Sequence, residues 1–170
     1  MSQTNSTGAQ NSTSDYAEAR QFLTFTLADE DYGVDILRVQ EIRGWNEVRT
    51  IPNTPSYVKG VLNLRGAIVP IIDLRTRFRL TKAEYTATTV IIVLAVETDD
   101  GRRTMGVVVD AVSDVLDVRP SDFKRSPSFG TKVDTRFMDG MVVVDKRMVI
   151  LLNADRLLDP EQISELDALR

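Results

Sequence analysis

The sequence of 170 residues contains neither cysteine nor histidine. Without cysteine there is no disulfide bond and no thiolate nucleophile, and without both residues the usual zinc sites are excluded. The lack of histidine also removes the commonest general base near neutral pH. No GxSxG motif, P-loop or dinucleotide fingerprint compensates for it. Carboxylate pairs and Ser/Lys arrangements remain possible, but these absences favour a protein that is not an enzyme and has no catalytic residue or metal site.

Long hydrophobic runs and an excess of basic residues are also missing. No stretch reaches the roughly 20 apolar residues that a membrane-spanning helix needs. Residues 1–17 have neither the basic start nor the apolar run of a signal peptide. The net charge of -4 is opposite in sign to that of a typical nucleic-acid-binding domain. We expect a cytoplasmic protein that binds no nucleic acid and inserts into no membrane.

The first 17 residues differ in composition from the rest of the chain. They are rich in serine, threonine, asparagine and glutamine and almost empty of large apolar groups. Such a segment cannot bury enough apolar surface to offset the entropy lost on ordering. We predict that residues 1–17 form a disordered tail and that residues 18–170 form the folded domain, which is long enough to bury a sizeable core.

Short apolar runs separated by glycine and aspartate follow the tail. This pattern is typical of a barrel or sandwich of antiparallel strands, and the predicted strand-rich runs are Phe22–Leu27, Tyr32–Ile42, Thr89–Glu97, Met105–Leu116 and Gly140–Asn153. Only Leu74–Leu80 and the segment from Pro160 to the end have the spacing of helices. We interpret the basic residues at 75, 77, 79 and 82 as a solvated helix face.

The chain also repeats itself. A shift of 73 places Gly33, Val34, Val39, Glu41 and Ile42 on Gly106, Val107, Val112, Asp114 and Val115. A shift of 80 places Gly60 on Gly140 and the run Ile71–Asp73 on Leu151–Asn153. The repeat predicts two copies of one small β unit. A unit of that size is near the lower limit for an independent core, so the copies should pack together and leave a groove between them.

The run GVLNLRGAIVPIIDL, residues 60–74, predicts a hairpin with Arg65 at its turn. Two-residue turns favour glycine, asparagine or aspartate, and Gly66 meets that rule while Arg65 does not. The second copy has Val143 to Lys146 in place of Asn63 to Gly66, so the turn itself does not demand the Arg-Gly pair. We predict that the Arg65 side chain lines the groove, held there by a nearby carboxylate or by backbone carbonyls.

Other readings of these residues remain open. Val39 and Val112 are equivalent in the repeat and could be core residues as well as groove residues. Glu41 could be a solvent-facing residue of an alternating strand. A small hydrolase that uses carboxylates such as Asp73 and Asp110 is the alternative from a different functional class.

Four blocks of the sequence resemble the CheW family of bacterial chemotaxis. They are EDYGVDILRVQEIRG, TPSYVKGVLNLRGAIVPIIDLR, GVVVDAVSDVL and MVILLNADRLL, and the resemblance covers roughly Arg20 to Leu158. It implies a mainly β fold of two SH3-like five-stranded β-barrels packed around a shared core, with short helices and a C-terminal helix. It also implies a scaffold without catalysis or cofactor, which couples chemoreceptors to the histidine kinase CheA through the CheW-like regulatory domain of that kinase.

The resemblance also implies which residues contact the partners. The groove between the barrels would take the helical hairpin at the cytoplasmic tip of a chemoreceptor, with contacts from Val39, Glu41, Gly60, Asn63, Arg65 and Val112. Kinase contact would use the ends of the barrels, with a second contact at Pro127 and Phe129 in the loop RSPSFG. The protein would then be recruited to membrane-associated receptor arrays. The alternative within the same fold is an adaptor of a different chemosensory array, such as one for surface motility.

Overall fold

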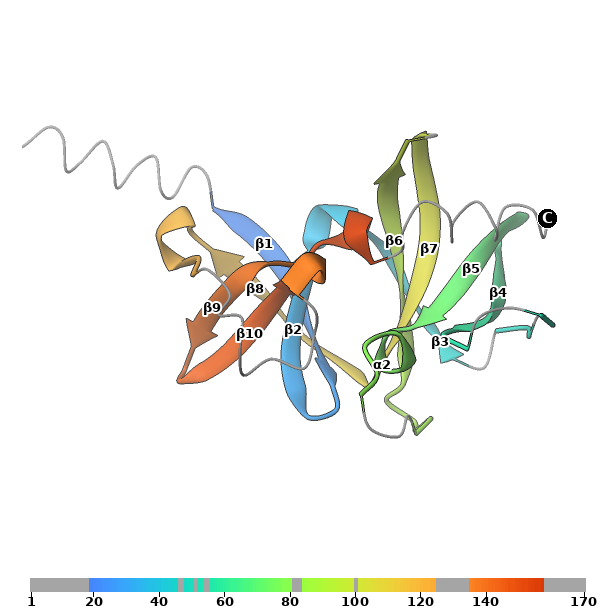
Figure 1. Cartoon of the computed structure of the whole chain (residues 1–170), viewed down its shortest axis with the longest axis horizontal. Coiled ribbons are helices and arrows are strands. Elements are labelled where there is room, and N and C mark those ends of the chain that lie inside the picture. Colours follow the sequence, from blue (N-terminus) through green and yellow to red (C-terminus); the bar gives the residue numbers. More distant parts are fainter. Residues whose placement is uncertain are drawn as a thin grey trace, which may run out of the picture.

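The computed structural model describes residues 19–45, 48–50, 52–53, 56–80, 84–99, 101–124 and 135–157. Their strands form two five-stranded sheets that lie side by side (Figure 1). Sheet A contains β1 (Arg20–Leu27), β2 (Glu30–Asp35), β8 (Ala111–Val118), β9 (Met138–Val144) and β10 (Arg147–Leu152). Sheet B contains β3 (Val39–Gly44), β4 (Val58–Leu64), β5 (Ala67–Asp73), β6 (Val90–Thr98) and β7 (Gly101–Val109). The predicted mainly β fold is confirmed.

Helical structure is limited to single turns within the described residues. They are α2 (Leu74–Arg77) and the 3-10 turns η1 (Ile36–Arg38), η3 (Pro120–Asp122), η4 (Thr135–Phe137) and η5 (Ala154–Arg156). The helix that was predicted over Leu74–Leu80 therefore ends early, at Arg77. The predicted tail and the predicted C-terminal helix lie outside the described residues.

The two sheets have the same topology. Their strand orders are β8-β1-β2-β10-β9 and β3-β6-β7-β5-β4, which become identical when β1 to β5 are matched in order with β6 to β10. In the parallel pairs, Gly33 lies opposite Leu151 as Gly106 lies opposite Ile71. The internal repeat is therefore confirmed. The two copies also exchange strands, because each copy contributes two strands to one sheet and three strands to the other.

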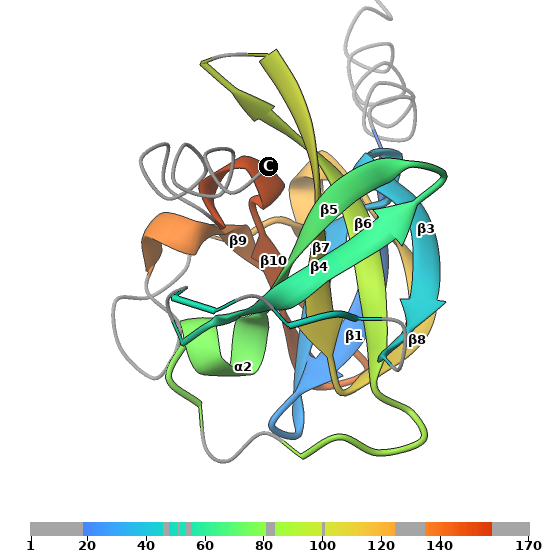
Figure 2. The ribbon, with the colours of Figure 1, turned by 90° about the vertical axis from the view of Figure 1, so that its right-hand side faces the viewer.

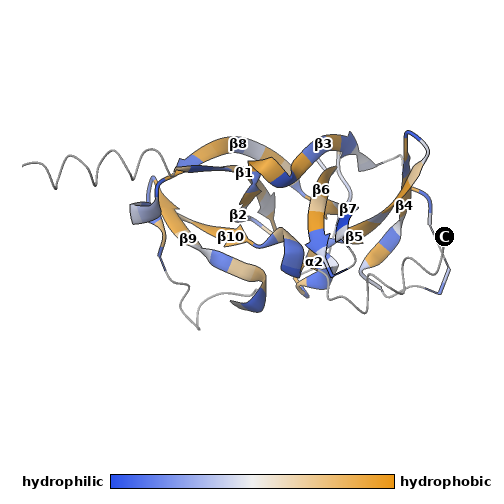
Figure 3. Ribbon diagram, turned by 90° about the horizontal axis from the view of Figure 1, so that it is seen from above, coloured by the Kyte–Doolittle hydropathy of each residue, from blue (hydrophilic) through white to orange (hydrophobic). Residues whose placement is uncertain are grey.

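The largest apolar cluster is shared between the sheets. Leu27 and Tyr32 of sheet A pack in it with Ile92 and Val107 of sheet B. Two smaller clusters lie within single sheets, one around Ile91 in sheet B and the other around Phe22 in sheet A. Apolar segments consequently recur along the strands of both halves (Figure 3). A common core of this kind fixes the two halves to each other through burial of apolar surface.

Three hairpins use the same two-residue turn. Both central residues have positive φ in the turns Ala28–Asp29, Arg65–Gly66 and Asp145–Lys146, as a type I′ turn requires. The second copy thus makes the equivalent hairpin with Asp145–Lys146, as the repeat predicts. Arg65 has a φ of 51°, so it adopts the left-handed conformation without being glycine, at a cost of roughly 1–2 kcal/mol.

Candidate functional site

Arg65 forms an ion pair with Glu41. Its Nη2 and Nη1 atoms donate to Glu41 Oε2 at 2.6 and 3.2 Å. Glu41 lies on β3 and Arg65 in the β4–β5 turn, so the pair connects the two edge strands of sheet B. The predicted carboxylate partner of Arg65 is therefore Glu41. The Arg65 side chain remains 71% exposed, which leaves much of the guanidinium accessible to a partner.

Glu41 is held from both sides. Arg43, two residues along β3, donates from Nη1 to Glu41 Oε1 at 3.1 Å. Both carboxylate oxygens therefore accept hydrogen bonds from arginine, and only 21% of the Glu41 side chain is exposed. Glu41 therefore belongs to an ion-pair cluster of three residues at the edge of sheet B.

Asn63 and Gly60 shape the same hairpin. Asn63 Oδ1 accepts a hydrogen bond of 2.9 Å from the backbone N–H of Gly66, which stabilises the turn that carries Arg65. Gly60 has a φ of 149°, and a Cβ there would lie 1.9 Å from the carbonyl oxygen of Arg49. Residues 49 and 61 exchange two backbone hydrogen bonds beside it. Gly60 is therefore required by close backbone packing.

Val39 is the first residue of β3 and Val112 the second residue of β8, the two equivalent edge strands. Both valines are half-buried and pack against the shared core. In β3 the pairing with β6 skips Gln40, and in β8 the pairing with β1 is irregular just after Val112. Such bulges bend a strand and redirect its side chains. Sequence reasoning could not find these bulges, because neither has a glycine to mark it.

The structure brings part of the predicted set together. Glu41, Asn63 and Arg65 meet at one hairpin, and Val39 precedes Glu41 on β3. Val112 belongs to sheet A, and its strand β8 lies on the same side of the molecule as β3 (Figures 2 and 3). Pro127 and Phe129 lie outside the described residues.

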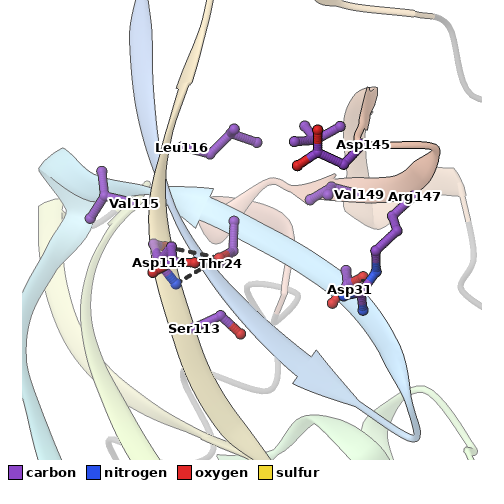
Figure 4. A pocket seen from close by; sticks show the side chains of 10 residues that line it. Thr24, Asp31, Ser113, Asp114, Val115, Leu116, Asp145, Arg147 and Val149 are labelled. Atoms are coloured by element: carbon purple, nitrogen blue, oxygen red, sulfur yellow. Dashed lines mark hydrogen bonds and ion pairs between the residues drawn. The ribbon is translucent and has the colours of Figure 1, made fainter.

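Sheet A has a pocket of about 450 Å³ (Figure 4). The pocket lies at the position in sheet A that is equivalent to the position of the Arg65–Glu41 pair in sheet B. The repeat places Asp145 at the position of Arg65 and Asp114 at that of Glu41. Two carboxylates repel each other, so no ion pair of this type crosses the mouth of the pocket. Its lining residues are Thr24, Asp31, Ser113, Asp114, Val115, Leu116, Val144, Asp145, Arg147 and Val149.

Asp73 and Asp110 converge, but they converge on an arginine. Arg75 donates from Nε and Nη2 to the two Asp73 oxygens, each at 3.0 Å, and from Nη1 to Asp110 Oδ1 at 2.8 Å. Burial opposes the charge of Arg75, but the hydrogen bonds and charges of Asp73 and Asp110 outweigh it and raise its pKa. Both carboxylates are thus engaged, which removes the support for a hydrolase that uses them as acid and base.

The interpretation of the basic run as a solvated helix face is wrong for Arg75, whose side chain is 2% exposed. Arg77 is also half-buried, and its guanidinium lies over the rings of Tyr57 and Phe137. Arg75 itself lies over Tyr85, whose hydroxyl donates to Asp73 at 3.1 Å. Desolvation and then the charge of Asp73 raise the pKa of Tyr85 to about 12.

Among the described residues, no helix has the length and apolar character to cross a membrane. No group of three or more acidic, histidine or cysteine side chains among them is arranged to hold a metal ion.

Comparisons with known proteins agree on one family. The CheW-like domain matches residues 21–162. "Chemotaxis protein CheW" of Klebsiella aerogenes is 45% identical over 148 residues, covering 87% of each chain. "Protein FrzA" of Myxococcus xanthus is 27% identical over 147 residues, covering 84% of this chain and 89% of that protein.

A solved structure shows the same fold. The scaffolding protein TtCheW from Thermoanaerobacter tengcongensis superposes with a TM-score of 0.76 and 31% sequence identity, over 84% of this chain and 90% of the other. The family match covers most of the sequence, and the agreement in fold extends across both sheets. The chain therefore belongs to the CheW-like domain family.

Proposed function

We propose that this protein is a non-enzymatic adaptor that couples chemoreceptors to the histidine kinase CheA. The observation that carries the proposal is the family match over residues 21–162, because it includes both sheets and the hairpin that presents Arg65. Relatives with up to 45% identity are named as chemotaxis proteins, and the related solved structure is described as a scaffolding protein.

The proposed receptor-contact surface consists of Val39, Glu41, Asn63, Arg65 and Val112. The half-buried valines offer apolar contact to a helical hairpin, and the exposed part of Arg65 offers several directed hydrogen bonds. In the free protein, Glu41 already fixes the Arg65 side chain through the ion pair, so less conformational entropy of that side chain is lost when the receptor binds. Gly60 contributes indirectly, because it allows the segment at Arg49 to pack on the hairpin.

The proposed kinase contacts are Pro127 and Phe129 together with the ends of the two five-stranded sheets. In sequence, Phe129 is an aromatic residue between two small residues, Ser128 and Gly130, and aromatic residues are typical interface anchors. Replacement of Phe129 by serine should weaken binding to the regulatory domain of CheA and leave the thermal midpoint nearly unchanged. A large drop in the midpoint would assign Phe129 to the core, since truncation of a buried phenylalanine costs about 3–5 kcal/mol.

Titration of the purified protein with a chemoreceptor cytoplasmic fragment and, separately, with the CheA regulatory domain tests the proposal. Both should bind, and both together should form a ternary complex. Arg65→Ala should weaken only the first interaction and Phe129→Ser only the second. If neither partner binds, the coupling function is refuted.

An adaptor of a different chemosensory array is the second candidate. It is supported by the match to Protein FrzA, although that identity of 27% is lower than the 45% to the Klebsiella protein. Parallel titrations with kinases from the different arrays of one cell would separate the two. In either case the protein acts at receptor arrays on the membrane, to which its partners recruit it.

A further inference from the structure

Two clusters of charged residues connect sheet A to sheet B. In the first, Arg38 donates from Nη1 and Nη2 to the two oxygens of Asp155, at 2.8 and 3.0 Å. Arg38 also donates to the carbonyl of Ala95, and Asp155 accepts from the backbone N–H of Glu97 at 2.7 Å. Ala95 and Glu97 belong to β6 of sheet B, while Asp155 follows β10 of sheet A. We call this cluster the exposed clasp.

The second cluster is centred on Arg75 and Asp110. Arg75 follows β5 of sheet B, and its Nη1 atom donates to Asp110 at 2.8 Å. Asp110 in turn accepts from the backbone N–H of Ala28, in the β1–β2 turn of sheet A, at 2.8 Å. Asp73 binds the rest of the guanidinium. We call this cluster the buried clasp.

The two clasps lie at corresponding crossings between the sheets, with their charges exchanged. Arg75 and Asp155 each come two residues after the capping residue of their turn, and both caps accept their backbone N–H at 3.0 Å. In the buried clasp the arginine follows the fifth strand, and the acid lies between β7 and β8. In the exposed clasp the acid follows the tenth strand, and the arginine lies between β2 and β3.

The capping residues agree with this exchange. The cap next to Arg75 is Asp73, whose negative charge complements the guanidinium. The cap next to Asp155 is Asn153, which accepts the same backbone hydrogen bond without placing a second negative charge beside the carboxylate. Each turn therefore has a cap that suits the sign of its own clasp.

We propose that Arg38 and Asp155, together with Arg75 and Asp110, are positioning residues that fix the two sheets at one relative orientation and thereby set the spacing of Val39 and Val112. Arg38 immediately precedes Val39 at the start of β3, and Asp110 lies two residues before Val112 at the start of β8. Each clasp therefore anchors the chain where it crosses between sheets. The receptor part of this inference rests on the proposed function.

Apolar packing alone does not supply this orientation. The shared core holds the sheets together, but apolar attraction is non-directional. A bidentate arginine–carboxylate pair adds a defined geometry. The Arg75 and Asp73 side chains are 2% and 0% exposed, whereas those of Arg38 and Asp155 are 25% and 32% exposed. The exposed clasp can therefore be altered while the fold remains intact.

The absence of native cysteine permits a direct test of orientation. Ala67→Cys and Lys146→Cys introduce one spin label beside the hairpin turn of each sheet, at exposed positions. Electron–electron distance measurements then compare the parent, Arg38→Asp, Asp155→Arg and the double exchange. Each single variant should shift or broaden the distance distribution, because two like charges then face each other. The double exchange restores opposite charges in the order of the buried clasp and should move the distribution back toward that of the parent. Recovery should be partial, because the exchanged side chains no longer match the Ala95 carbonyl and the Glu97 N–H.

Receptor binding is measured on the same variants without labels. Each single variant should lower affinity for the receptor fragment by about fivefold, the scale of a half-exposed ion pair, and the double exchange should recover part of it. Arg102→Ala removes the Arg102–Glu97 pair, which lies within sheet B, and should change neither readout. The thermal midpoint of Arg102→Ala shows how much the loss of an exposed ion pair alone lowers stability, and the midpoints of the clasp variants are compared with it.

The inference is overturned if the single variants keep the parent distance distribution, or if the double exchange brings it no closer to that of the parent than the single variants do. Failure of the proposed function looks different: the parent itself would not bind the receptor fragment, while the distance measurements would still respond to the clasp. Distances that respond without any change in receptor affinity would refute the link to Val39 and Val112.

Discussion

Substitution of Arg65 by asparagine should separate the function of this residue from its role in the fold. Asparagine followed by Gly66 is a favoured sequence for a type I′ turn, and asparagine tolerates the left-handed conformation that Arg65 adopts at φ 51°. The change also removes the ion pair with Glu41. The variant thus improves the turn while it deletes the proposed contact.

The two effects on stability can be estimated. Relief of the left-handed conformation is worth roughly 1 kcal/mol, and loss of an ion pair whose arginine is 71% exposed costs about 0.2–1 kcal/mol. The free energy of unfolding should therefore stay constant or rise by up to about 1 kcal/mol. For a chain of this size that corresponds to a thermal midpoint between unchanged and about 4 °C higher.

Receptor affinity should change in the opposite direction. Loss of an interface arginine commonly costs more than about 1 kcal/mol, so we expect a tenfold or larger increase in the dissociation constant for the receptor fragment. Arg65→Lys should recover little of it, because an ammonium group cannot reproduce the planar fork. Arg147→Ala is the matched control, since the Arg147–Asp31 pair has exposures of 67% and 17%. It should leave receptor binding unchanged.

Two results would refute this reasoning. A midpoint that falls by more than about 4 °C would show that the ion pair holds the fold, because an exposed pair of this kind is worth at most about 1 kcal/mol. Receptor affinity equal to that of the parent would show that Arg65 makes no contact with the receptor.

Three further predictions concern the surroundings of the site. Gly60→Ala should cost about 2–3 kcal/mol in chemical denaturation, because its Cβ would meet the Arg49 carbonyl, whereas Gly66→Ala, with open space around it, should cost only about 1; equal costs would contradict the packing argument. Arg75→Met should cost about 3–5 kcal/mol, since it leaves Asp73 buried without its partner, and a neutral effect would show that the cluster is dispensable. Because the pKa of Tyr85 is raised to about 12, its contribution to the free energy of unfolding is full below pH 10 and is lost as the pH rises through about 12. The free energy of unfolding should therefore fall less steeply between pH 10 and 12 for Tyr85→Phe than for the parent. An equally steep fall would show that Tyr85 does not have a raised pKa.

Much of the fold could be predicted because the signals are local or repeated. Alternating apolar residues predict strands such as β1, and the offsets of 73 and 80 predict two copies of one unit. Arg65 was predicted to be held by a carboxylate of unknown position or by backbone carbonyls, and the partner is a carboxylate. The structure identifies it as Glu41, 24 residues earlier, and strand pairing at that distance leaves no local pattern in the sequence.

The exchange of strands between the copies could not be predicted in the same way. An edge strand has the same pattern of residues whichever sheet it joins, so β3 and β8 give no sign of crossing over. The burial of Arg75 was missed for a related reason. Three basic residues in the short run from Leu74 resemble a solvated face, and one of the two carboxylates that compensate Arg75, Asp110, lies 35 residues away.

The charge exchange between the clasps could not be recognised from the internal repeat, because a repeat is recognised by similar residues. Comparison of the copies aligns like with like, so it finds Gly60 with Gly140 and passes over Arg75 and Asp155, which are opposite in charge. What the two copies share at that position is an interaction between sheets, and either order of charges satisfies it. Because each sheet contains strands from both copies, reversal of the charge of one residue of a clasp can be compensated by reversal of the charge of its partner. The capping residues fit this, since the uncharged Asn153 stands beside Asp155 where the acidic Asp73 stands beside Arg75. Equivalent sites in repeated folds should therefore be compared by their contacts as well as by their residues.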